Sequence, residues 1–143
     1  MTGARSVFLA LLLCCGPALA EDEPEIDCAD MTNLPQQHMN WCAGQDFEAA
    51  DAELNAVWRE SIAAARLADT ELKDMGDDGR PGYEETLKAG QRAWIGYRDG
   101  WCAYVGFQAR GGSLEPFLVS SCMAGLTRAR TRELQDDLEG LGN

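Results

Sequence analysis

The distribution of cysteines limits the fold of this chain more than any other feature of its sequence. The chain has 143 residues and 6 cysteines, and Cys14 and Cys15 lie in an apolar N-terminal run that we expect to be removed. The remaining cysteines are Cys28, Cys42, Cys102 and Cys122. An even number of cysteines in an exported chain predicts disulfides rather than free thiols, because the compartment is oxidising.

The N-terminal run has the layout of an export signal. Arg5 precedes an apolar stretch at residues 7–15, and Ala18 and Ala20 place small side chains where a signal peptidase reads the chain. The stretch is too short to span a bilayer as an uncleaved anchor, and acidic residues follow it directly. We therefore predict a signal peptide at residues 1–20, cleavage after Ala20, no membrane insertion afterwards, and a periplasmic or secreted protein.

The four remaining cysteines allow three disulfide pairings. We favour Cys28–Cys42 with Cys102–Cys122, because each pair closes a short local loop. A zinc site is the competing interpretation, but no two of these cysteines are two to four residues apart and His38 is the only histidine. We expect no metal.

Apolar residues recur at helical spacing in three stretches that are separated by glycine-rich breaks. The first predicted helix covers about residues 34–73, with Asn33 as its cap and Pro35 in its opening turn. Residues 76–82 read as a loop, and a second helix is expected over residues 83–107. After the Gly111-Gly112 break, Ser113 is expected to cap a third helix that ends near residue 138.

These elements predict an all-α fold: a small antiparallel bundle of about three helices, with one long hairpin, stapled by two disulfides. Residues 21–32, which include Cys28, are expected to form a flexible acidic leader. The helical domain is expected at residues 33–138, and a C-terminal tail at residues 139–143.

Four polar residues interrupt the apolar stripes of the first two predicted helices: Asp51, Asn55, Gln91 and Arg98. Buried polar groups need hydrogen-bond partners, and a buried charge needs an opposite one. We therefore expect a polar seam across the hairpin, in which Asp51 and Arg98 pair and fix the helix register. The alternatives are a catalytic carboxylate at Asp51 and an exposed binding cluster.

Motifs for catalysis or cofactor binding are not found in the sequence. It contains no phosphate-binding glycine loop and no Gly-x-Ser-x-Gly elbow, and a single histidine makes a catalytic triad difficult to build. We predict no catalytic residues and no cofactor. The tryptophans suggest a carbohydrate-stacking platform, but Trp58 and Trp94 fall on inward stripes, whereas Trp41 and Trp101 are less constrained.

The charge balance is strongly acidic, with 24 Asp and Glu against 12 Lys and Arg and a formal net charge of −12. Removal of Arg5 makes the mature domain one unit more negative. Such a domain repels nucleic acid and favours cationic partners. Loops that protrude from a stapled scaffold are the expected binding elements. The candidate residues are Asp77, Asp78, Arg80, Gly111, Gly112 and Ser113.

Segments spread over the mature chain resemble the LprI-type lysozyme-inhibitor domain family. These are Gln36-Gln37-His38-Met39-Asn40-Trp41-Cys42, Ala50-Asp51-Ala52-Glu53-Leu54-Asn55, Gln91-Arg92-Ala93-Trp94-Ile95, Tyr97-Arg98-Asp99, Gly111-Gly112-Ser113 and Leu126-Thr127-Arg128-Ala129-Arg130. The resemblance extends from Cys28 to about Leu134, and Trp58 departs from it only in replacing a common Tyr by another aromatic residue.

The resemblance implies a helical, secreted or periplasmic domain, and named members of that family inhibit lysozyme. From it we expect an exported binding protein that blocks a basic lysozyme-type muralytic enzyme or binds another basic envelope protein. A cell-envelope structural or adaptor protein with no enzyme target is the alternative.

Overall fold

The computed structural model describes residues 26–76 and 78–141. The predicted signal peptide, the first part of the predicted leader and Asp77 lie outside the described residues. The elements are α1 (Gln36–Met75), α2 (Tyr83–Gly106), a short 3₁₀ helix η1 (Phe107–Ala109) and α3 (Glu115–Leu141). No strand occurs among the described residues, and the predicted all-α class is confirmed.

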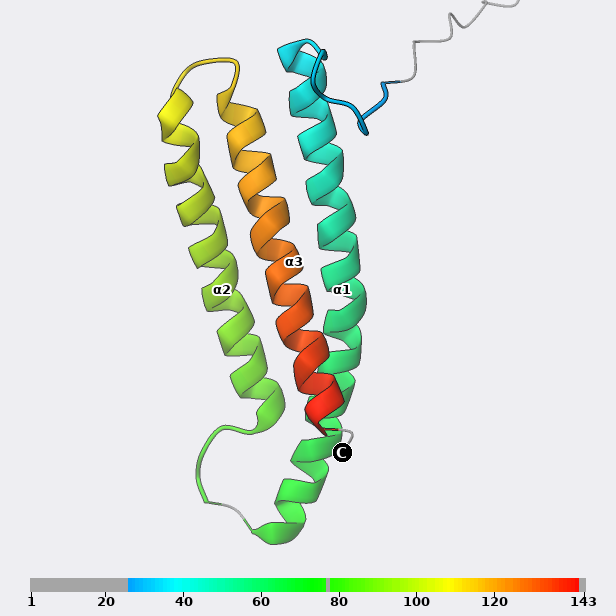
Figure 1. Cartoon of the computed structure of the whole chain (residues 1–143). Coiled ribbons are helices and arrows are strands. Elements are labelled where there is room, and N and C mark those ends of the chain that lie inside the picture. Colours follow the sequence, from blue (N-terminus) through cyan, green and yellow to red (C-terminus); the bar gives the residue numbers. More distant parts are fainter. Residues whose placement is uncertain (1–25, 77, 142–143) are drawn as a thin grey trace, which may run out of the picture.

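The three α-helices form an elongated antiparallel bundle (Figure 1). α1 and α2 make the hairpin, and α3 runs back beside both, with its most extensive packing against α1. The α1–α2 loop and the C-terminal end of α3 lie at one end of the bundle. The start of α1 and the α2–α3 loop lie at the other end.

The apolar core lies between the three helices, around the middle of α1 and the second half of α3. Leu54, Val57 and Leu134 are buried there, and partly buried apolar side chains pack around them: Trp58, Leu87, Trp94 and Leu138. The predicted inward positions of Trp58 and Trp94 are therefore confirmed. Elsewhere the interface is built from small side chains such as Ala43 and Ala50, which let α1 approach its neighbours closely.

The helix starts differ from those expected. α1 begins at Gln36, Pro35 occupies the capping position, and no side chain caps the helix, so Asn33 as the cap was wrong. The pyrrolidine ring of Pro35 disfavours helical backbone at Leu34, so the helix begins after the proline. The backbone oxygen of Pro35 accepts the first helical hydrogen bonds instead.

The third helix also begins and ends later than expected. α3 starts at Glu115, two residues after Ser113, and continues to Leu141, beyond the expected end at Leu138. Gly111 adopts a φ of 75°, and its N–H donates a 2.6 Å hydrogen bond to the carboxylate of Glu115. The turn therefore includes Ser113 and Leu114, and the helix begins one residue later than a cap at Ser113 requires.

Both predicted disulfides are present, with Cys28 joined to Cys42 and Cys102 joined to Cys122. The first attaches the segment before α1 to α1, so the part of the predicted leader around Cys28 is fixed to the bundle. The second crosslinks α2 to α3. Gly106 lets these helices approach, because a Cβ added there would lie 2.5 Å from Cγ2 of Val119.

Candidate functional site

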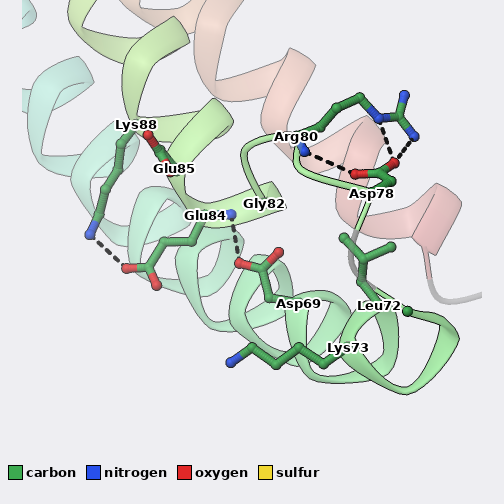
Figure 2. Close-up of a pocket in the computed structure, with 10 residues that line it drawn as sticks. Asp69, Leu72, Lys73, Asp78, Arg80, Gly82, Glu84, Glu85 and Lys88 are labelled. Carbon is green, nitrogen blue, oxygen red and sulfur yellow. Dashed lines mark hydrogen bonds and ion pairs between the residues drawn. The ribbon is translucent and has the colours of Figure 1, made fainter.

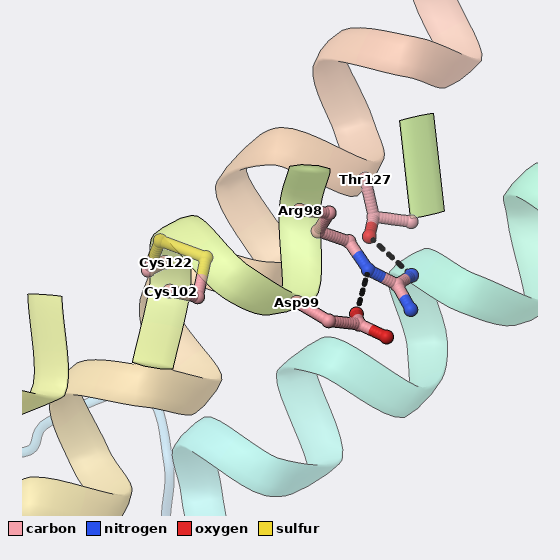
Figure 3. Close-up of a disulfide and its surroundings, with 5 residues drawn as sticks. All are labelled: Arg98, Asp99, Cys102, Cys122 and Thr127. Carbon is pink, nitrogen blue, oxygen red and sulfur yellow. Dashed lines mark hydrogen bonds and ion pairs between the residues drawn. A yellow bond between two sulfur atoms is a disulfide. The ribbon is translucent and has the colours of Figure 1, made fainter. Parts of the chain in front are cut away.

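Arg98 contacts residues of all three helices, and Figure 3 shows its side chain beside Asp99 and Thr127. Its guanidinium donates to Asp51 at 3.4 Å, to the neighbouring Asp99 at 2.9 Å and to Oγ1 of Thr127 at 3.3 Å. The Arg98 side chain is 9% exposed, whereas those of Asp51 and Asp99 are 42% and 52% exposed. The buried Arg98 guanidinium is thus balanced by two partly exposed carboxylates. Through its hydrogen bonds it links α2 to both other helices.

Aromatic rings complete the surroundings of Arg98. Its guanidinium carbon lies 5.2 Å from the ring centroids of both Phe47 and Trp94, which is within the range of cation–π attraction. The side chain therefore has ring contacts and hydrogen bonds at the same time.

The other two residues of the predicted seam have partners of their own. Asn55 donates a 2.8 Å hydrogen bond to Asp51 one turn away. Gln91 lies apart from this group and accepts a 3.0 Å hydrogen bond from Arg130 of α3. No buried side-chain nitrogen or oxygen atom of the described part of the chain is left without a hydrogen-bond partner. The Gln91–Arg130 hydrogen bond thus links α2 to α3, whereas the Asn55–Asp51 bond lies within α1.

The loop at residues 76–82 borders a surface cavity of about 640 Å³ (Figure 2). Asp69, Lys73, Arg80, Glu84 and Lys88 line it. An adjoining, more apolar cavity of about 580 Å³ has Pro81 and Leu87 in its lining. The predicted candidates Asp78 and Arg80 face each other there as an exposed ion pair, with an Arg80 Nε to carboxylate distance of 2.6 Å.

The second candidate loop is short and held at both sides. Ser113 accepts a 2.9 Å hydrogen bond at its backbone oxygen from the side chain of Asn40 on α1. Gly112 donates its N–H to Ala109 at 2.8 Å, and Gly111, Gly112 and Ser113 are all exposed.

The two candidate loops lie at opposite ends of the bundle (Figure 1). α2 connects them with 24 residues, which at 1.5 Å per residue spans about 36 Å. The structure therefore does not bring the two loops together, and a single cleft in a partner protein would contact one end only.

Three exposed aromatic residues form a stripe on the last half of α2, which we call the aromatic stripe: Tyr97, Trp101 and Tyr104. Their spacing of four and three residues puts them on one helix face. The Tyr97 and Trp101 ring centroids are 6.5 Å apart, and those of Trp101 and Tyr104 are 5.5 Å apart. The two tyrosines were not identified from the sequence, although this spacing was readable there.

Most basic side chains of the described part of the chain are already neutralised by acidic ones. Six of them form ion pairs: Arg66, Arg80, Lys88, Arg98, Arg128 and Arg130. Hydrogen bonds from Arg66 and then Lys88 lower the pKa of Glu84 to about 2. A hydrogen bond from Arg128 likewise lowers the pKa of Asp46. The acidic residues outnumber the basic ones, and they therefore determine the electrostatic field around the protein that a binding partner meets.

The described residues contain no group of three or more side chains arranged to hold a metal ion. None of the helices there is both long enough and apolar enough to cross a membrane.

Together, the fold and these contacts define an acidic, disulfide-crosslinked three-helix bundle whose internal polar groups bind one another. The chain belongs to the LprI family: the family model described as "Lysozyme inhibitor LprI" matches residues 28–134. A relative from Rhizobium meliloti (strain 1021), "Uncharacterized protein R02472", is 51% identical over 140 residues, which are 98% of this chain and 99% of the relative. No solved structure matches the chain.

Proposed function

We propose that the mature protein binds a basic lysozyme-type muralytic enzyme outside the cytoplasm and blocks access to its cleft. Membership of the LprI family carries this proposal, since the family is described as a lysozyme inhibitor. The disulfides support an oxidising, extracytoplasmic location.

The charge of the protein supports a basic partner. The chain has twice as many acidic as basic residues, and many of its basic side chains are engaged in internal ion pairs. An acidic surface attracts a basic enzyme over a distance of about a Debye length, ~10 Å at 0.1 M salt. This attraction raises the rate of association, and close contacts then set the lifetime of the complex.

The internal contacts of the bundle support binding over catalysis. Asp51, the carboxylate considered for proton transfer, bonds Asn55 and Arg98. Both cavities lie at the loop of residues 76–82, away from Asp51. The candidate contact regions are the loop of residues 76–82 and the loop of residues 111–113. One partner molecule engages only one of these two loops.

The test measures lysis of peptidoglycan by a panel of basic lysozymes, with the purified, oxidised mature protein in excess. We expect slower lysis by at least one enzyme, and association about tenfold slower when the salt concentration is raised from 0.05 to 0.5 M. Undiminished lysis by every enzyme, together with co-purification of a non-enzymatic envelope component, would favour the adaptor role instead.

A further inference from the structure

We infer that the aromatic stripe, Tyr97, Trp101 and Tyr104, is the surface that holds the basic partner, whose Lys and Arg side chains contact its exposed rings. This inference rests on the proposed function and selects one of the two ends of the bundle. The stripe occupies the half of α2 nearest to the loop of residues 111–113.

The exposure of the rings is the first observation. Tyr97, Trp101 and Tyr104 are 56%, 46% and 64% exposed, while Trp94, only three residues before Tyr97, packs against the core. The rings lie beside one another, with centroid distances of 6.5 Å between Tyr97 and Trp101 and 5.5 Å between Trp101 and Tyr104. The helix therefore displays three large, partly exposed rings side by side.

The rigidity of the helix beneath the rings is the second observation. Cys102 follows Trp101 directly, is fully buried, and is bonded to Cys122 of α3. Arg98 holds the preceding turn to both other helices, and Gly106 packs closely against Val119. Rings mounted on a fixed backbone lose little conformational entropy on binding, which is why Trp and Tyr dominate binding hot spots.

The charge of the protein decides which partner fits. Ring faces attract Lys and Arg side chains, and the acidic excess of the chain adds long-range attraction for the same cations. A neutral glycan would also stack on aromatic rings, but it would gain nothing from that charge. At this end of the bundle a ring already receives a guanidinium, since Arg110 lies 4.6 Å from the ring centroid of Phe107.

Trp101→Ala is the test variant, and Trp41→Ala is its matched control. Trp41 is 48% exposed, almost the same as Trp101, but it lies on α1 outside the stripe. Replacing Asp78 and Arg80 by serine together tests the opposite end of the bundle. Tyr104→Ala is a second stripe variant, and it leaves the residues next to Cys102 unchanged. Circular dichroism and thermal unfolding of each oxidised mature variant show whether it is folded.

We expect Trp101→Ala to weaken binding to an inhibited lysozyme by about 30-fold or more, as a hot-spot residue does. Trp101→Phe keeps an aromatic ring, so its affinity should fall by less than about fivefold. Trp101→Leu should bind about as weakly as the alanine variant. Trp41→Ala and the Asp78/Arg80 variant should bind within about twofold of the wild type.

Three results would overturn the inference in different ways. If the wild type binds lysozyme and the Trp101 and Tyr104 variants bind equally well, the stripe is not the contact surface, and the proposed function stands. If chitohexaose binds the wild type in a Trp101-dependent manner while lysozyme does not, the stripe is a glycan platform. If no lysozyme binds the wild type and chitohexaose does not either, the proposed function fails together with this inference.

Discussion

The carboxylate of Asp69, near the end of α1, accepts a 2.5 Å hydrogen bond from the backbone N–H of Tyr83, the first residue of α2. It also accepts a 3.1 Å hydrogen bond from the N–H of Glu84. α2 has no side-chain cap of its own at Gly82, so α1 supplies the cap across the hairpin. Gly82 permits this contact, because a Cβ there would lie 2.5 Å from Oδ1 of Asp69.

Asp69→Ala is therefore expected to lower the free energy of unfolding by about 1 kcal/mol, as the loss of a helix cap does. Urea denaturation of the oxidised protein measures this change. Glu71→Ala removes an exposed acid from the same turn and should change stability by less than about 0.5 kcal/mol. Equal effects of the two substitutions would show that the capping contact does not stabilise the hairpin.

Arg98→Ala is expected to lower the free energy of unfolding by about 2–4 kcal/mol. The loss combines a cavity between two rings with the loss of hydrogen bonds to Asp51 and Thr127. Arg92, an exposed arginine of the same helix, provides the control, and its alanine variant should be nearly as stable as the wild type. Unchanged thermal stability of Arg98→Ala would contradict the role of the seam in fixing helix register.

Two glycines of α2 should respond to alanine in opposite directions. At Gly90 an added Cβ meets nothing within 4 Å, so Gly90→Ala should stabilise the protein by about 0.5–1 kcal/mol. At Gly106 the added Cβ would clash with Val119, so Gly106→Ala should destabilise it by about 1–3 kcal/mol. Thermal unfolding of both variants under one set of conditions tests the sign of each effect.

The pKa of the Glu84 carboxyl should be about 2, well below its ordinary value of 4.5, because Arg66 and Lys88 donate hydrogen bonds to it. Since this pKa is lowered by folding, the associated stability is present above pH 4.5 and is lost as the pH falls toward 2. An NMR titration of the side-chain carboxyls measures the value directly. Lys88→Met should raise it, while the lowered pKa of Asp46, which depends on Arg128, should not change.

The helices and the disulfides could be predicted because their signals are local. Apolar residues repeat with helical period in each stretch, and each disulfide closes a short segment, with sequence separations of 14 and 20. The start of α1 was predictable in principle, since a proline disfavours helix at the residue before it. Pro35 therefore excludes a helix that is capped by Asn33 and begins at Leu34.

Contacts between helices could not be read from the sequence in the same way. The polar residues of the stripes were identified, but Thr127 as a partner of Arg98 depends on how α3 lies against α2. The cap from Asp69 likewise requires the geometry of the hairpin. For the aromatic stripe, spacing alone did not show that Trp94 is covered and Trp101 is exposed, because that depends on which face of α2 the other helices occupy.

Both crosslinks lie at the same end of the bundle, and neither spans the loop of residues 76–82. A protease that cuts this loop would therefore leave two pieces held only by noncovalent packing: α1 with Cys28–Cys42, and α2 with α3 joined through Cys102–Cys122. A cut in the loop of residues 107–114 would leave α2 and α3 bonded to each other. A single cut at the uncrosslinked end thus separates the covalent chain into two parts, whereas a single cut between α2 and α3 leaves the whole chain covalently connected.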